Sequence, residues 1–304
     1  MGIYSAAKLY DLDFIPICIE EYDLIIPDHA WETPMVQNLL DNSYWEQPSK
    51  IVNQRGVSTF TNNAYNIDRW HLDTNGTASI KTGGITIDPS ASSSNLILSQ
   101  WRNDLPDGNY TIAVKVVGVG VYYATFAVSG AGTEVSYIDA SHRNFGNGLV
   151  GAEYTSNRGV RCLISGAAGK SAFTIAWVAL YMGEYTAETL PAYVPKGYGT
   201  ELAECMRYYQ RRDYVITTLQ PANENIVAGF DFMMPVRTNP TITIYDNAGT
   251  PGAVSTWTSS GITNGIAVTQ IARNTGSGIG YMVMSAAPTT NARLIYRWEA
   301  NADL

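Results

Sequence analysis

The sequence predicts an all-β fold of two antiparallel, jelly-roll-like β-sandwich domains, joined by a short hinge that contains a helix. Three observations predict it. Short segments whose polarity alternates with a period of two recur from residue 37 onward, and residues 109–116 are a clear example. Tight-turn dipeptides such as Asn75-Gly76 and Asp107-Gly108 separate these segments. The chain has 304 residues, enough for two domains that each bury a core.

Residues 1–36 differ from the rest of the chain. They are acidic, and their short apolar runs, 14–17 and 24–27, each contain a proline. Proline is tolerated in edge strands and extended arms but discourages a long helix. We expect either an arm that attaches to a neighbouring subunit or virion partner, or a strand packed on its own domain.

Residues 37–190 are expected to form the first sandwich. In the segment 109–116 the apolar side chains Ile112, Val114 and Val116 share one face, as in a half-buried strand. The segment 171–182 is apolar on both faces, with Phe173, Ile175 and Trp177 on one side, which indicates a central strand covered twice.

Residues 191–206 are expected to form the hinge. Prolines and glycines at 191–199 interrupt the strand pattern, and a short helical composition follows from Thr200. The Thr200 hydroxyl is expected to cap this helix, and Glu201 and Glu204 to complement the positive charge at its start.

Residues 207–304 are expected to form a smaller second sandwich. The segment 241–252 indicates a strand followed by a turn, and Asn264-Gly265 is expected to be the turn of a hairpin. In the segment 293–299, Leu294, Tyr296 and Trp298 alternate with the residues between them. A fixed-period repeat is missing from the sequence, which argues against a parallel β-helix or a propeller.

Composition and charge exclude several classes of function. The net charge is -8, so a duplex nucleic-acid binder is disfavoured. The sequence has neither an apolar run of about 20 residues nor a secretory signal, so we expect no membrane insertion and synthesis in a cytoplasm. Cys18, Cys162 and Cys205 lie far apart and are expected to be packed thiols. We expect no cofactor and no metal site, because Asp11-x-Asp13 is only a fragment of a calcium loop.

The sequence favours a protein that is not an enzyme. His29, His71 and His142 are the only histidines, and the G-x-S-x-G pattern of a nucleophile elbow is missing. The segment 169–171 resembles the end of a P-loop, but Ile164 replaces its first glycine. Carboxylates that might pair for glycoside hydrolysis exist, but the sequence does not place two of them across a cleft. These carboxylates are Asp104, Asp107, Asp139, Glu184 and Glu188.

Two groups of residues are the candidate ligand-binding sites. Aromatic rings stack on sugar rings, and Asn, Asp and Arg side chains bind sugar hydroxyls. The first group lies in one loop and consists of Tyr137, Asp139, His142, Arg143 and Asn144. The second group surrounds a turn in the second domain and consists of Tyr245, Asp246, Asn247 and Trp257. Loop packing or a subunit interface would use the same residue types.

Several short sequence segments, in their order along the chain, resemble tail-fibre and receptor-binding proteins of tailed phages and prophages. These segments are NLLDNSYW at 38–45, VNQRG at 52–56, YNIDRW at 65–70, the run 177–199 and ELAECMRYYQR at 201–211. The resemblance implies a carbohydrate-binding-like jelly roll followed by a distal β-domain. It also implies a homotrimer in the virion tail that contacts other tail or baseplate proteins and binds host cell-surface polysaccharide. It implies core positions for Trp70 and Trp177.

Together these observations predict a non-catalytic tail-fibre or receptor-binding protein that attaches to host surface glycans. Two other classes stay open. One is a structural baseplate or fibre connector without a glycan site, and the other is a polysaccharide-degrading tail enzyme, which would place two carboxylates across a groove.

Overall fold

The computed structural model describes residues 36–73, 76–129, 137–138, 142–155, 159–218, 227–274, 279–284 and 293–303. The chain divides into two compact units, Met1–Val36 and Gln37–Leu304. The expected N-terminal arm, residues 1–36, lies outside the described residues except for Val36.

The fold is all-β and sandwich-like, as the sequence predicts. Within the described residues it contains nineteen strands, one α-helix and one 3-10 turn (Pro48–Lys50). No helix among these residues is long and apolar enough to cross a membrane.

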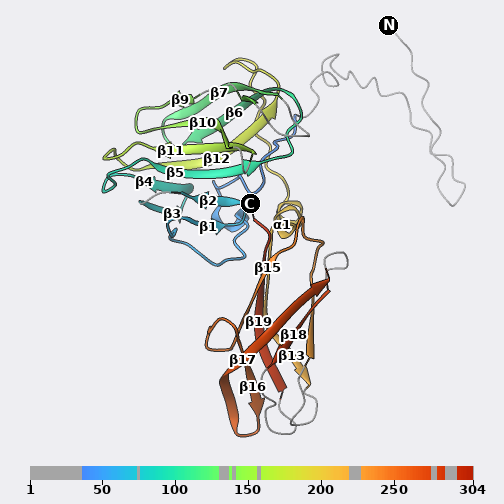
Figure 1. Ribbon diagram of the computed structural model, residues 1–304. Helices are drawn as coiled ribbons and strands as arrows, with labels where there is room; N and C mark the ends of the chain where they lie inside the picture. Colours follow the sequence, from blue (N-terminus) through green and yellow to red (C-terminus); the bar gives the residue numbers. More distant parts are fainter. Residues whose placement is uncertain are drawn as a thin grey trace, which may run out of the picture. The chain divides into compact units, whose positions relative to one another are not determined.

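Two antiparallel six-stranded sheets form the first part of the unit (Figure 1). The β5 sheet has the order β1 (Ala64–Ile67), β2 (Trp70–Leu72), β5 (Leu96–Arg102), β11 (Gly159–Gly166), β10 (Gly148–Thr155) and β9 (His142–Asn144). The β12 sheet has the order β3 (Thr77–Lys81), β4 (Gly84–Asp88), β12 (Phe173–Met182), β6 (Gly108–Val116), β7 (Gly120–Ser129) and β8 (Tyr137–Ile138). The chain crosses between the sheets after β2, β4, β5, β8 and β11.

The facing sides of these two sheets form one apolar core. Trp70 of β2 and Ile164 of β11 belong to the same buried cluster as Ile112 of β6 and Val178 of β12. Cys162 also lies in this cluster, and burial raises the pKa of its thiol to about 12. Burial of this continuous cluster is the main force that holds the sheets together.

Trp177 departs from the expected pattern. Phe173 and Ile175 face the core, but the register of β12 shifts between Ile175 and Trp177. This irregularity turns Trp177 to the opposite face, where its ring stacks on Tyr193 with centroids 4.7 Å apart. The segment that carries Tyr193 therefore covers the outer side of β12. Trp177 is buried as expected, but the expectation that it shares a side with Phe173 and Ile175 is wrong.

The segment expected to be the hinge contains helix α1 (Tyr198–Met206), which begins two residues before Thr200. Its N-cap is Gly197, and no side chain caps it, so the expected capping by Thr200 is wrong. Glu201 is buried and accepts a 2.6 Å hydrogen bond from the backbone N–H of Asn42. Glu201 thus ties α1 to the loop that precedes the sandwich strands.

A second sheet system follows the hinge. Its strands are β13 (Tyr209–Thr218), β19 (Arg293–Asn301), β16 (Ala253–Thr258), β17 (Gly261–Asn274), β18 (Ile279–Met284), β14 (Val227–Asp231) and β15 (Thr241–Tyr245). Strand β19 is central, with β13 on one side and β15 and β16 on the other. Leu294, Tyr296 and Trp298 of β19 are buried in a second apolar cluster, so the predicted alternation is confirmed.

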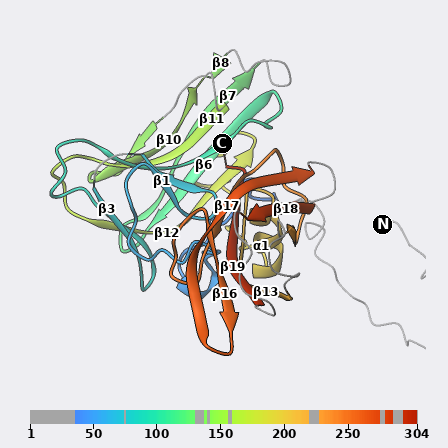
Figure 2. The same cartoon turned by 60° about the horizontal axis from the view of Figure 1, so that its bottom comes forward.

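The expected hairpin about Asn264-Gly265 is wrong, because both residues lie inside β17. Gly265 adopts a φ of +81°, and the register with β16 shifts nearby, between Val254 and Thr256. The glycine thus permits a bulge instead of a turn. Figure 2 shows β17 as one long strand, which pairs first with β16 and then with β18.

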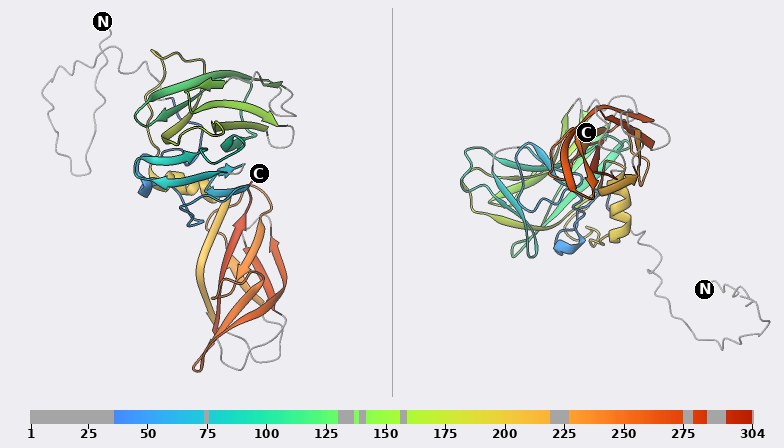
Figure 3. Two further views of the ribbon diagram at one scale, coloured as in Figure 1. Left: turned by 90° about the vertical axis from the view of Figure 1, so that its left-hand side faces the viewer. Right: turned by 90° about the horizontal axis from the view of Figure 1, so that it is seen from below.

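The end of the chain returns to β1 and β2 of the sandwich (Figure 3). Here the buried Arg69 donates hydrogen bonds to Asp41 and to the carbonyl of Trp101, both at 3.1 Å. Its guanidinium carbon lies 3.4 Å from the centroid of the Tyr208 ring. Asp303 forms ion pairs with both Arg69 and Arg55.

Arg69 also has a φ of +73°, a conformation that costs roughly 1–2 kcal/mol for a residue other than glycine. Its side-chain contacts offset that cost. We call Asp41, Arg55, Arg69, Tyr208, Tyr209 and Asp303 the junction cluster.

Candidate functional site

The first predicted group of ligand-binding residues is spread over two sheets. Tyr137 belongs to β8 of the β12 sheet, and Asp139 lies outside the described residues. His142, Arg143 and Asn144 form the exposed edge strand β9 of the β5 sheet. The described part of this group lines neither of the two cavities considered below.

His142 contacts a polar network on the outward face of the β5 sheet. Its Nε2 lies 3.5 Å from Glu153, which also accepts a hydrogen bond from Arg161. Arg161 in turn pairs with Asp73, whose other oxygen lies 2.6 Å from Nδ1 of His71. The groups of this network bind one another, so we interpret it as structural.

The second predicted group lies at the end of β15. Asp246 is buried, and its carboxylate accepts hydrogen bonds from the backbone N–H groups of Thr250 (2.8 Å) and Gly265 (2.9 Å). Burial alone would raise the pKa of Asp246, but these hydrogen bonds outweigh it and hold the pKa below its ordinary value. Asp246 therefore fixes the turn that begins with it.

The turn at residues 246–250 is held over one face of the sheet built on β19 and its partners β13, β15 and β16, here the β19 sheet. The backbone N–H of Asn247 donates a 2.8 Å hydrogen bond to Ser255 Oγ, which donates to Asn264 at 2.6 Å. Ser255 is fully buried. Gly249 adopts a φ of +89°, which a residue with a side chain rarely does. The bulge at Gly265 and the turn thus support each other.

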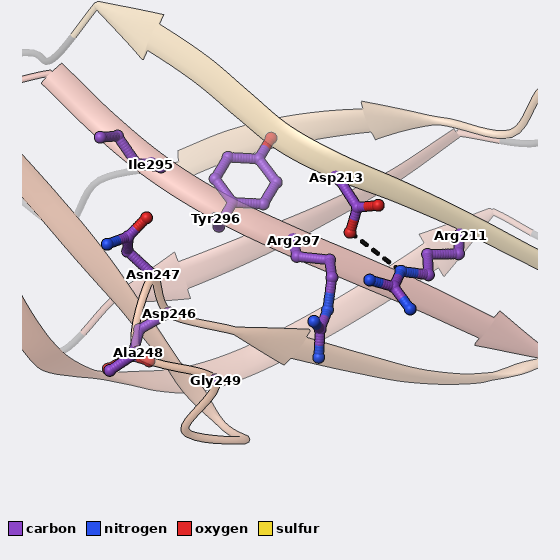
Figure 4. Close-up of a pocket in the computed structure, with 9 residues that line it drawn as sticks. All are labelled: Arg211, Asp213, Asp246, Asn247, Ala248, Gly249, Ile295, Tyr296 and Arg297. Atoms are coloured by element: carbon purple, nitrogen blue, oxygen red, sulfur yellow. Dashed lines mark hydrogen bonds and ion pairs between the residues drawn. The ribbon is translucent and has the colours of Figure 1, made fainter. Parts of the chain in front are cut away.

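A cavity of about 240 Å³ lies between this turn and strands β13 and β19 (Figure 4). We call it the turn cavity. Its lining consists of Arg211, Asp213, Asp246, Asn247, Ala248, Gly249, Ile295, Tyr296 and Arg297. Its volume is below the roughly 300–1,000 Å³ of sites for drug-sized ligands, so it suits a single small ring or headgroup.

Two arginines contribute hydrogen-bond donors to the turn cavity. In Figure 4 the Arg297 side chain projects from β19 on the side of the turn with Asn247, and the Arg211 side chain lies beside Asp213. The Arg297 guanidinium carbon lies 4.2 Å from the centroid of the Tyr245 ring, and Arg211 donates to Asp213 at 2.9 Å. Both guanidinium groups are therefore held in place before any ligand arrives.

The chemistry of the turn cavity fits binding better than catalysis. Its two carboxylates are Asp213 and Asp246. Both oxygens of Asp246 already accept backbone hydrogen bonds, so Asp246 is poorly suited to transfer protons. Arginine, asparagine and one carboxylate are instead a set of donors and acceptors for hydroxyl or acidic groups.

Trp257 lies at a separate cavity of about 290 Å³, whose lining is Trp257, Thr258, Ser259 and Arg293. We call it the tryptophan cavity. The Trp257 side chain is 42% exposed, which is unusual for so large an apolar group. The Arg293 guanidinium carbon lies 5.5 Å from the centroid of the Trp257 ring.

Sequence reasoning missed the arginines of both cavities. Arg211 comes from β13, and Arg293 and Arg297 come from β19, far along the chain from the turn. The sequence contained a signal for the arginines of β19. Arg293 and Arg297 alternate with the buried Leu294 and Tyr296, so they lie on the other face of the strand. What the sequence did not reveal is that the turn folds over this same polar face.

Comparison with known proteins gives one short match. A family model described as a PBP superfamily domain matches residues 1–42 of the 304. No curated protein matches the chain. The matched segment overlaps the described residues only at 36–42, so it carries no argument about the cavities. The described part of the chain contains no group of three or more His, Cys, Asp or Glu side chains that could hold a metal ion.

Proposed function

We propose that the protein is a non-catalytic attachment protein of a phage or prophage tail, and that it binds a glycan of the host surface in the turn cavity. The observation that carries this proposal is the pair of immobilised guanidinium groups, Arg211 and Arg297, beside Asn247 in a cavity sized for one sugar ring. The assignment to a virion tail depends on the sequence resemblance to tail-fibre proteins.

The fold supports such a role in two ways. Rigid sheets hold the turn and its partners, and loops on rigid scaffolds are frequent binding sites. A single cavity of this size gives only weak binding, but several copies in one particle raise the overall avidity by orders of magnitude. A trimer, as the resemblance implies, would provide those copies.

The proposal is tested with an array of bacterial capsular and O-antigen polysaccharides probed with the purified full chain. We expect binding to a narrow set of polysaccharides, and we expect Arg297→Gln to lower that binding about tenfold or more. Lys115→Gln, far from the cavity in β6, is the matched control and should bind like the wild type. Thermal unfolding of both variants checks that the fold is kept.

Three outcomes would count against the proposal. Absence of wild-type binding to every polysaccharide and to bacterial cells favours a structural connector. Unchanged binding by Arg297→Gln places the ligand elsewhere. Release of reducing ends from a bound polysaccharide indicates a degrading enzyme.

A further inference from the structure

The turn cavity and the tryptophan cavity open on the same face of the β19 sheet. Residues 294, 296 and 298 of β19 point into the core, so Arg293, Ile295 and Arg297 point to the opposite face. On the neighbouring strands, Trp257 lies directly beside Arg293, and Tyr245 lies directly beside Arg297. Side chains that lie opposite each other in a ladder share one face.

The two cavities are close together along this face. Ile295 lines the turn cavity and Arg293 lines the tryptophan cavity, and they are consecutive outward positions of β19. Two successive residue steps along a strand span about 7 Å, and the four steps from Arg293 to Arg297 span about 13 Å. That distance is longer than one sugar ring and suits a short chain of linked sugars.

The residues of the tryptophan cavity fit a sugar that carries an acidic group. The exposed indole offers an apolar surface on which a sugar ring stacks. Thr258 and Ser259 add hydroxyls. Among the described residues of the lining, Arg293 is the charged one, and it gives this part of the cavity a positive charge. In the turn cavity, by contrast, Arg211 is paired with Asp213.

We propose that the tryptophan cavity is a second subsite, and that the ligand is an extended acidic oligosaccharide that reaches from Arg297 to Trp257 across the turn at residues 246–250, because Ile295 and Ser255 between the two cavities are buried. This inference rests on the glycan binding proposed above. In it, Trp257 stacks on a sugar ring, and Arg293 binds the carboxylate of the same or the next sugar. The turn cavity holds a sugar farther along the chain.

The test uses size-fractionated oligosaccharides of the polysaccharide that binds best on the array, with isothermal calorimetry on the full chain. We expect Trp257→Ala to lower affinity about tenfold for the longer fragments and to leave the shortest binding fragment unaffected. Trp257→Tyr, which keeps an aromatic ring, should retain most of the affinity. Val119→Ala, an exposed apolar residue of the first sandwich, is the matched control.

The charge of the ligand is tested with the same fragments after their carboxyl groups have been reduced to alcohols. Arg293→Gln should weaken binding of the native fragments several-fold and leave binding of the reduced fragments unchanged. The inference is overturned if Trp257→Ala affects long and short fragments equally or not at all, or if carboxyl reduction does not change wild-type affinity. Those results leave the proposed function intact, whereas an ineffective Arg297→Gln or a wild type that binds nothing refutes the proposed function itself.

Discussion

The junction cluster and the outward face of the β19 sheet both contain arginine stacked on tyrosine, but the arginines of the two regions differ in burial and in what they contact. In the junction cluster, Arg69 stacks on Tyr208 and Arg55 stacks on Tyr209, at 3.4 and 3.7 Å from the ring centroids. On the β19 face, Arg297 stacks on Tyr245 at 4.2 Å. In all three pairs the flat guanidinium lies against an aromatic ring, which orients its donors.

The two regions differ in burial and in what the remaining donors meet. The Arg69 side chain is 1% exposed, and its Nε and Nη2 donate to Asp41 and to a backbone carbonyl. The Arg297 side chain is 28% exposed, and it borders a cavity. Stacking of an arginine on a tyrosine therefore does not by itself mark a binding site. A stacked arginine is free to bind a ligand only where part of it stays open to solvent.

The largest expected effect is the loss of the buried arginine. Arg69→Ala leaves Asp41 and Asp303 buried with fewer opposite charges, and we expect it to lower the free energy of unfolding by about 3–5 kcal/mol. Urea denaturation followed by tryptophan fluorescence measures this loss. A loss below about 1 kcal/mol would show that the junction cluster contributes little, and the contrast with Arg297 would fail.

A pH effect on stability is the next largest, and it comes from the acidic groups beside the junction cluster. Burial, partly offset by Arg55, raises the pKa of Asp68 to about 6, and burial also raises the pKa of Glu201 to about 7. The folded state therefore holds these protons more tightly than the unfolded chain does. Their contribution to stability is greatest near pH 4, falls as the pH rises to about 6–7, and is constant above that.

Asp68→Asn separates this effect from other titrations. The variant should reduce the difference in free energy of unfolding between pH 4.5 and pH 7 by about 2 kcal/mol. Denaturation curves at these two pH values measure it. Asp104→Asn is the control, because the pKa of the exposed Asp104 is lowered and its titration lies below this window. An unchanged difference in Asp68→Asn would show that Asp68 is ionised in the folded protein throughout the window.

How much of this could be predicted from the sequence depends on whether a feature is local. The all-β class and the buried stripe Leu294–Trp298 follow from a period of two, which is a property of neighbouring residues. The position of Trp177 does not follow from this period, because one irregularity in the pairing of β12 turns the Trp177 side chain to the other face of the strand. The bulge at Gly265 was mistaken for a turn for a similar reason. A glycine with positive φ occurs both in hairpin turns and in bulges, and which of the two forms depends on the strand with which the segment pairs.

The candidate site shows the same division. Asp246 and Asn247 were found from local turn chemistry, and both line the turn cavity. Arg211 and Arg297 were missed, because their strands β13 and β19 are separated by some eighty residues and meet only in the folded sheet. Sequence reasoning placed Trp257 beside the turn, but it lies at a different cavity.

A smaller effect is expected from the turn itself. Asp246→Ala removes the acceptor for the N–H groups of Thr250 and Gly265, and we expect a loss of about 1–3 kcal/mol in unfolding free energy. Because the turn forms one wall of the turn cavity, glycan binding should weaken together with stability. Chemical denaturation and the polysaccharide array measure the two losses. A stable variant with normal binding would show that the turn is held by other contacts.

The smallest effect on stability is expected at Arg297. Its contacts are one stacking interaction with Tyr245 and a 3.6 Å ion pair with Glu299, both partly open to solvent. Such contacts are each worth about 0.5–1 kcal/mol or less. Arg297→Gln should therefore change the unfolding free energy by about 2 kcal/mol at most while it lowers glycan binding, whereas Arg69→Ala should act mainly on stability. If Arg297→Gln destabilises the protein as strongly as Arg69→Ala does, both arginines are structural, and the open guanidinium of the turn cavity is not a ligand-binding group.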